Sequence, residues 1–437
     1  MGPYVDIPRT EGCEGLKING KQPQWMSAAE AVGLIQPNHT VALGGMLAEP
    51  PTLVAELIRQ RERFRHLPIY VMPAGSPCEY GNPEWKDFFS LKCFMLSFRL
   101  REAYRQGMAD YVPCNLSDLP KVMAQLQPDV ALIQTTPPNE QGQVSLGMAA
   151  DYTVSLVRHA KLVIAEVNPE LPWVFGAGTL DAGEIDVFVH SERPPYELPA
   201  AEPSAIDEQV AAYVAELIPD RATIQVGIGS LGGSILRALK GKKGLGMHTG
   251  SLADEVVELV EAGALTGEYK EVDEGQIVAA CLIGSRRLNR FADKNEQVQL
   301  RTSDYTHHSA TLARFRRFCA VNFALEIDLS GNVNAESLGD LYVSGVGGQV
   351  DFMRGAMMSE EGVSVIAMHA TAQGGRRSRI VPKVARTTSL KSDVHYVVTE
   401  FGVASLYGKS LKERAEALIQ VAHPDFRDAL RKAMMEN

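Results

Sequence analysis

Residues 225–240 read QVGIGSLGGSILRALK, and this stretch decides the fold class. A short apolar run is followed by a glycine-rich turn and then by apolar residues at helical spacing. A strand, a tight turn and a helix in this order predict one unit of an α/β sheet with parallel strands. Gly227, Gly229 and Gly232 also fit the G-x-G-x-x-G spacing of dinucleotide-binding turns. That spacing alone is equally typical of an ordinary structural turn.

The same alternation continues on both sides of this stretch. TVALGGM (40–46), DVALIQTT (129–136) and AKLVIAEVN (160–168) predict strands before it, and VSVIAMHA (363–370) predicts one after it. Helical patterns separate these runs, so the sequence predicts mostly parallel sheets with crossover helices. HSERPPYELPAAEPS (190–204) is rich in proline and charge, and it predicts a linker or an extended arm.

The linker and the chain length together predict two domains. A chain of 437 residues is too long for one typical core. We expect an N-terminal domain over residues 1–215 and a C-terminal domain over residues 216–437, both of the α/β class.

Composition excludes several classes of protein. The net charge of -10 argues against nucleic acid as the main partner. No apolar run is long enough to span a membrane, and the N-terminal MGPYVDIPRTEG (1–12) lacks the pattern of a signal peptide. The six cysteines form no C-x-x-C pair, so neither a metal site nor a redox dithiol is predicted. These features favour a cytoplasmic protein without a metal site.

A second strand-to-helix join lies in GLGMHTGSLADEVVELVE (244–261), and its tip is Gly250. A nicotinamide-binding sheet would need a carboxylate at this point to hold the ribose hydroxyls. The glycine therefore argues against that class of cofactor. The residues that follow predict a helix in which Ser251 is the N-cap and Asp254 its capping partner.

Three further features are candidate binding elements. VSGVGGQVDFMRGA (343–356) has enough glycines to let the backbone approach a ligand closely. QGGRRSRIVP (373–382) carries Arg376, Arg377 and Arg379, which could hold a phosphate or could form a solvated basic face. The adjacent pair His307-His308 has no metal-ligand spacing, and it predicts a solvated loop.

Four stretches together carry a resemblance to a known family. They are DVALIQTTPPNEQGQVSLGMAADYT (129–153), GIGSLGGSIL (227–236), LSGNVNAESLGDLYVSGVGGQVDFMRGA (329–356) and DVHYVVTEFGVASLYGKSLKERAEALIQVAHPDFR (393–427). The chain resembles the acetyl-CoA hydrolase/transferase family, especially its 4-hydroxybutyrate CoA-transferases. The resemblance implies two CoA-transferase-type domains with the active site in the cleft between them. It also implies a homo-oligomer, either a dimer or a tetramer.

The resemblance implies a reaction and a set of site residues. In this family a glutamate attacks the thioester of an acyl-CoA, and coenzyme A then passes to a free carboxylate, so coenzyme A is a substrate and no cofactor is bound permanently. The position of that glutamate corresponds to Gly250 here. The residues that the resemblance assigns to the coenzyme A cleft are Gly227, Ile228, Gly229, Ser230, Leu231, Asn322, Gly345, Gly347 and Gly348.

The glycine at position 250 leaves three readings open. Another carboxylate could act, either Glu79 in MPAGSPCEYGNPEW (72–85) or Glu49 after the first strand, although each is also typical of a hydrogen-bonded loop residue. The glycine could instead admit a larger substrate whose own carboxylate attacks. The chain could also be catalytically weak and bind acyl-CoA, alone or with another subunit. We favour a CoA-transferase for short mono- or dicarboxylic acids such as 4-hydroxybutyrate, butyrate, succinate or itaconate; the alternative enzyme is an acyl-CoA thioesterase.

Overall fold

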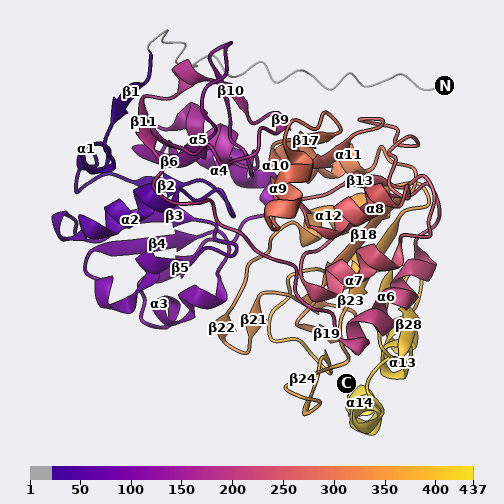
Figure 1. Ribbon diagram of the computed structural model, residues 1–437. Helices are drawn as coiled ribbons and strands as arrows, with labels where there is room; N and C mark the ends of the chain where they lie inside the picture. Colours follow the sequence, from indigo (N-terminus) through magenta and orange to yellow (C-terminus); the bar gives the residue numbers. More distant parts are fainter. Residues whose placement is uncertain (1–21, 437) are drawn as a thin grey trace, which may run out of the picture.

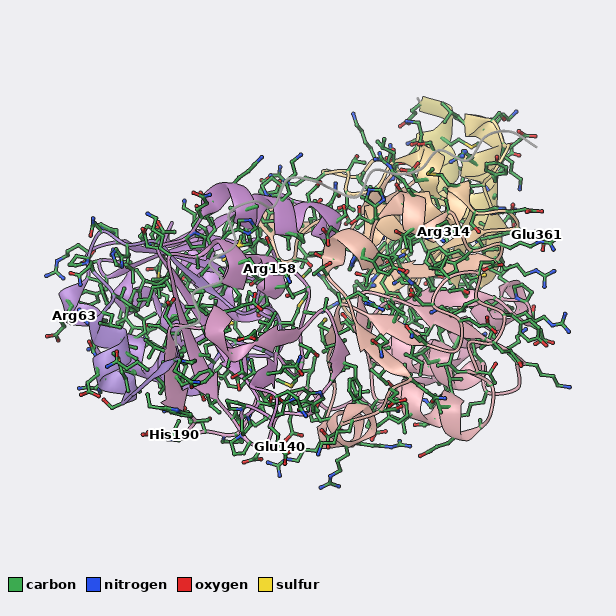
Figure 2. All side chains as sticks on the ribbon, turned by 90° about the horizontal axis from the view of Figure 1, so that it is seen from above. Arg63, Glu140, Arg158, His190, Arg314 and Glu361 are labelled. Carbon is green, nitrogen blue, oxygen red and sulfur yellow. The ribbon has the colours of Figure 1, made fainter. Side chains whose placement is uncertain are left out.

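The computed structural model describes residues 22–436 and consists of two α/β halves (Figure 1). Figure 2 shows the halves side by side, with Arg63 at the outer end of the first and Glu361 at the outer end of the second. The stretch 1–12, from which we inferred the lack of a signal peptide, and Cys13 lie outside the described residues. No helix within residues 22–436 has the length and apolarity needed to cross a membrane.

The first half is built on an eight-stranded sheet in the order β1-β11-β8-β6-β2-β3-β4-β5. Every neighbouring pair in this sheet is parallel. Its strands are β1 (Gln24–Met26), β2 (Val41–Leu43), β3 (Leu67–Val71), β4 (Phe89–Cys93), β5 (Ala109–Tyr111), β6 (Val130–Thr135), β8 (Leu162–Val167) and β11 (Val187–His190). The predicted runs 40–46, 129–136 and 160–168 each contain one of them, which confirms those three strands.

The second half contains a nine-stranded sheet in the order β28-β27-β23-β18-β12-β13-β15-β17-β9. Only the pair β27–β28 is antiparallel among the neighbours of this sheet. Its strands are β9 (Phe175–Gly176), β12 (Thr223–Val226), β13 (Gly246–His248), β15 (Ile277–Ala279), β17 (Val298–Leu300), β18 (Phe318–Phe323), β23 (Val363–Ala367), β27 (Tyr396–Thr399) and β28 (Gly402–Ser405). The mostly parallel α/β fold class is therefore confirmed.

Helices and short strands complete both halves (Figure 1). The helices are α1 (Ala28–Gly33), α2 (Pro51–Arg59), α3 (Arg101–Arg105), α4 (Leu119–Leu126), α5 (Thr153–His159), α6 (Ala205–Leu217), α7 (Ser230–Ala238), α8 (Glu255–Glu261), α9 (Arg286–Ala292), α10 (Ser303–Thr306), α11 (Ser309–Leu312), α12 (Gln349–Met358), α13 (Leu411–Gln420) and α14 (Pro424–Glu436). The short strands are β7 (Gln143–Ser145), β10 (Thr179–Asp181), β14 (Ser251–Leu252), β16 (Cys281–Leu282), β19 (Glu326–Asp328), β20 (Val333–Asn334), β21 (Ser337–Leu338), β22 (Leu341–Tyr342), β24 (Thr371–Ala372), β25 (Arg377–Ser378) and β26 (Ile380–Val381).

The two halves are joined by more than the linker. Residues 191–204 form no helix or strand, as predicted from their proline content. β9 comes from the chain before this linker, yet it pairs with β17 of the second sheet. One continuous hydrophobic core also contains side chains from both halves, including Met46 and Leu252. This packing holds the C-terminal ends of β12, β13 and β18 against the first half. In open α/β sheets, binding sites lie at the C-terminal ends of the strands.

The predicted cap of α8 is wrong. Ser251 and Leu252 pair with β16, and the helix begins only at Glu255. The Asp254 carboxylate instead accepts hydrogen bonds from the backbone N–H and hydroxyl of Ser285, at 3.0 and 2.9 Å. Strand pairing, which depends on a distant segment, has displaced the local capping pattern.

Candidate active site

A cleft of about 560 Å³ lies between the two halves. Its floor is formed by the residues at and just after the ends of β12, β13 and β18. Gln225 and Asn322 pair their side-chain amides across this floor, with Nδ2 of Asn322 donating to Oε1 of Gln225 at 3.1 Å. Met46, Ala74 and Met95 form part of the wall from the first half.

Most residues that the resemblance assigned to the coenzyme A cleft line this space. They are Gly227, Ile228, Asn322, Gly345, Gly347 and Gly348, and Gly250 lines it too. The remaining three, Gly229, Ser230 and Leu231, form the N-cap and first turn of α7 and do not line the cleft. The loop after β12 therefore lines the cleft with its first residues, next to the strand, and α7 extends away from the cleft.

The glycine loop 343–348 reaches across and docks on the first half. The backbone N–H of Val346 donates to the Tyr111 hydroxyl at 2.8 Å, and that hydroxyl donates to Glu336 at 2.7 Å. The N–H of Leu116 donates to the Gly347 carbonyl oxygen at 3.2 Å. A Cβ on Gly345 would lie 2.8 Å from the carbonyl oxygen of Phe94, so only glycine permits this approach. This loop closes one side of the cleft.

The arginine cluster divides between the cleft and the surface. Arg379 lines the cleft and is partly buried. Arg376 and Arg377 are exposed at the hairpin β24–β25, and Arg377 forms an ion pair with Glu326. Only Arg379 of the three is placed to meet a ligand inside the cleft.

Glu49 and Glu79 both lie outside the cleft wall. The Glu49 side chain is buried, and its Oε2 accepts hydrogen bonds from the hydroxyls of Tyr80 at 2.9 Å and Ser76 at 3.1 Å. Burial raises the pKa of Glu49 to about 7. Glu79 is exposed, and it is the first residue of a 3₁₀ turn whose other residues are buried.

A histidine occupies the space beside Gly250. A Cβ built on Gly250 would lie 2.8 Å from Nε2 of His307, and one built on Gly348 would lie 2.7 Å from the same atom. His307 itself lines the cleft, and its ring packs on that of Phe352 with centroids 4.5 Å apart. The imidazole edge is thus inserted between two glycines where a side chain at either position would collide with it.

The solvated loop predicted for His307-His308 is wrong for the first residue. His307 is 1% exposed, whereas His308 is exposed and accepts a bond from the N–H of Ala310. Burial lowers the pKa of His307 to about 3, so its ring is neutral near pH 7. Nδ1 of His307 lies 2.8 Å from the Thr306 hydroxyl. No local pattern in the sequence signals this burial, because the residues that cover the ring come from the loop after β13 and from the start of α12.

A small chamber behind Gly250 contains a carboxylate that the sequence analysis did not single out. The chamber has a volume of about 20 Å³ and is lined by Gly250, His307 and Asp151, among others. Asp151 is buried, and its Oδ1 accepts a hydrogen bond from the Thr153 hydroxyl at 2.8 Å. Burial raises the pKa of Asp151 to about 6. No group of three or more His, Cys, Asp or Glu in residues 22–436 is arranged to hold a metal ion.

Two family models match the chain. The acetyl-CoA hydrolase/transferase N-terminal domain matches residues 19–198, and the C-terminal domain of that family matches residues 284–434. The chain belongs to the acetyl-CoA hydrolase/transferase family. The family model for the second domain begins after Gly250 and includes the loop 343–348.

Similar proteins support this membership over nearly the whole chain. The 4-hydroxybutyrate coenzyme A transferase of Clostridium kluyveri is 37% identical over 93% of this chain and 96% of its own. The succinyl-CoA:acetate/propanoyl-CoA:succinate CoA transferase of Fasciola hepatica is 33% identical over 99% of this chain and 92% of its own. The crystal structure of RipA from Yersinia pestis superposes with a TM-score of 0.90 at 31% identity, covering 94% of this chain and 97% of that one.

Proposed function

We propose that this family member transfers coenzyme A from an acyl-CoA to a short free carboxylic acid, and that the reaction takes place in the cleft between the two halves. The observation that carries the proposal is the glycine-walled cleft, in a chain whose relatives over nearly its full length are CoA transferases. The cleft is large enough for a thioester group with its pantetheine arm, since small-molecule sites have volumes of about 300–1,000 Å³.

The walls suggest how coenzyme A lies. Loops 227–228 and 343–348 present backbone to the ligand, which suits the narrow pantetheine arm. The helix α12 begins at Gln349, and its N-cap Gly348 lies on the cleft, so its first N–H groups and its dipole favour negative charge there. Arg379 supplies a cation for a phosphate. The thioester then lies at the inner end, beside Gly250.

The inner wall favours aliphatic acyl groups. Met46, Leu116, Ile283 and Phe352 line the cleft in addition to the glycines, and Arg379 is its one permanently charged lining residue among those that the structure describes. We place 4-hydroxybutyrate, butyrate, succinate and itaconate in the class of acids to be tested. The acid must also displace water, because water at the reacting centre would turn the transferase into a hydrolase.

A two-part assay tests the function. Purified protein is incubated with acetyl-CoA or butyryl-CoA and each acid in turn, and new acyl-CoA species are separated by mass. Appearance of the acid's own CoA thioester supports the proposal. Free thiol released at the same rate with and without acid would overturn it in favour of a thioesterase. Tight binding of acyl-CoA with neither product would make the protein a CoA-ester-binding protein.

The thioesterase is the second candidate because one observation favours it. Gly250 places no carboxylate at the family's reacting position, so an activated water could take the role of acceptor. The free-thiol measurement above, made without added acid, separates the two.

A further inference from the structure

We propose that the imidazole of His307 attacks the thioester carbonyl, in place of the carboxylate that is missing at Gly250. This inference rests on the proposed function and names the reacting group of the same site. It differs from all three readings that the sequence left open, since none of them involved His307.

The first argument is position. Nε2 of His307 lies within 2.8 Å of the points where a Cβ on Gly250 or Gly348 would stand, and both glycines line the cleft. The side chain of a residue at position 250 would start in the space that the imidazole now fills. The two glycines therefore do more than leave room for substrate, because they admit one ring to the inner end of the cleft.

The second argument is the protonation of the ring. The Thr306 hydroxyl lies within hydrogen-bond distance of the Thr302 carbonyl oxygen, at 3.3 Å, and this carbonyl can only accept. A hydroxyl has one proton, so a Thr306 that donates to Thr302 must accept from Nδ1 of His307, 2.8 Å away. Nδ1 then carries the hydrogen, and Nε2 keeps the lone pair that faces the cleft.

The third argument is that the ring is held. The Phe352 ring packs against the His307 ring with the two planes tilted by 43°. His248 donates from Nε2 to the Thr306 carbonyl oxygen at 3.1 Å, which fixes the turn that carries His307. His248 is itself buried. Burial is the main cause that lowers its pKa to about 3, and the charge of Lys270 lowers it further. A fixed nucleophile within reach of a bound thioester gains from proximity and orientation.

The chemistry balances without another reactant. Nε2 attacks the thioester carbon, the C–N bond forms, the C–S bond breaks, and coenzyme A leaves as its thiolate beside an acyl-imidazolium. The acceptor carboxylate attacks the acyl carbon, which frees neutral imidazole and forms a mixed anhydride. The thiolate then attacks the acceptor's carbonyl in that anhydride. The products are the new acyl-CoA and the first acid as its carboxylate, and no proton is gained or lost overall.

Isotope exchange tests the first step by itself. Wild-type protein is incubated with unlabelled acetyl-CoA and labelled coenzyme A, without any free acid. An enzyme-bound acyl group lets label enter acetyl-CoA, so exchange is expected from the wild type. His307→Asn keeps a polar group facing Thr306 and removes Nε2, and exchange should fall by at least about 100-fold. His308→Asn, a change at the exposed neighbouring histidine, is the matched control and should exchange as the wild type does.

A rescue experiment separates chemistry from folding. His307→Ala leaves a ring-sized space open to the cleft, and added imidazole should restore exchange in proportion to its concentration. Transfer to an acid in the wild type without any exchange in the acid's absence would overturn the role of His307 and leave the proposed function standing. Transfer that survives in His307→Asn would do the same. Absence of transfer to every acid tested, with exchange present, would instead overturn the proposed function alone.

Discussion

His248 and Thr306 are joined by a hydrogen bond of 3.1 Å, from Nε2 of the imidazole to the carbonyl oxygen. The bond links the end of β13, which leads to Gly250, with the turn after α10, which carries His307. The two elements that meet at the inner end of the cleft are therefore held at a fixed separation by one buried pair. The hydroxyl of the same Thr306 lies 2.8 Å from Nδ1 of His307.

The hydroxyl of Thr306 can be removed at nearly constant volume. Thr306→Val deletes the acceptor for Nδ1–H, and the ring of His307 loses its preference for the tautomer with a free Nε2. We expect kcat for CoA transfer to fall on the order of tenfold or more, with KM for acyl-CoA little changed, because binding contacts are kept. Thr306→Ser, which keeps the hydroxyl, is the control. A Val variant with wild-type kcat would show that the hydroxyl does not orient the ring.

Glu49 gives a prediction for stability rather than activity. Its pKa rises to about 7 in the folded protein from 4.5, mainly through burial. The folded state therefore binds more protons than the unfolded state between these values, and the free energy of unfolding falls as pH rises through them. Glu49→Gln removes this dependence. Relative to the variant, the wild type should lose about 3 kcal/mol between pH 4.5 and pH 8.

Chemical denaturation at both pH values measures this difference. Glu84→Gln is the matched control, because Glu84 is exposed and is not among the groups that shift the pKa of Glu49. If the wild type and Glu49→Gln differ by the same free energy at both pH values, the carboxylate of Glu49 is not held in its protonated form by the fold.

The strands and the mostly parallel α/β class could be predicted from the sequence because both depend on local patterns of apolar and turn residues. The runs 129–136 and 160–168 became β6 and β8, and 225–240 became the end of β12, a glycine turn and α7. A short apolar run bounded by turn residues indicates a buried strand, and this indication does not depend on which strands it pairs with. The linker at 191–204 was predictable for the same reason, since proline content acts locally.

The features that escaped the sequence analysis all depend on distant partners. The strand at Ser251 exists because Cys281 pairs with it, and this pairing displaced the predicted cap. β9 joins the second sheet across the linker. His307 is buried by Phe352 and by two glycines from separate loops, so its burial required their arrangement in space. The glycines of the cleft were located by resemblance, whereas their contact with an imidazole was not.

The loop 343–348 yields a prediction for binding. Gly347 has a φ of +61°, a conformation that a β-branched residue adopts only with strain. Gly347→Val should lower the free energy of unfolding by about 1–3 kcal/mol and weaken CoA binding by about tenfold or more, because the loop lines the cleft. Gly408→Val imposes similar strain, with φ at +73°, at a site outside the cleft. Calorimetry should show unchanged CoA affinity for the second variant. Equal affinities for both would show that Gly347 does not meet coenzyme A.

Placing a carboxylate at residue 250 gives the most discriminating pair of variants. In Gly250→Glu the new Cβ would lie 2.8 Å from Nε2 of His307, so the ring or the strand end must move. Overpacking of this kind costs about 1–3 kcal/mol of stability. We expect this single variant to be less stable and less active than the wild type, because the displaced ring no longer faces the thioester.

Adding His307→Ala to Gly250→Glu clears the space that the carboxylate needs. The double variant should recover the stability that the single variant loses, and it should transfer coenzyme A through residue 250. After incubation with acyl-CoA, peptide mass analysis should find a CoA thioester on the peptide that holds residue 250, whereas the wild type should show none there. The variant His307→Ala without the glutamate should be nearly inactive. A double variant that stays unstable would show that His307 and a side chain at 250 do not compete for one space. A double variant that is stable but forms no adduct would show that residue 250 does not reach the thioester. In that case the imidazole would also lie away from the reacting carbon.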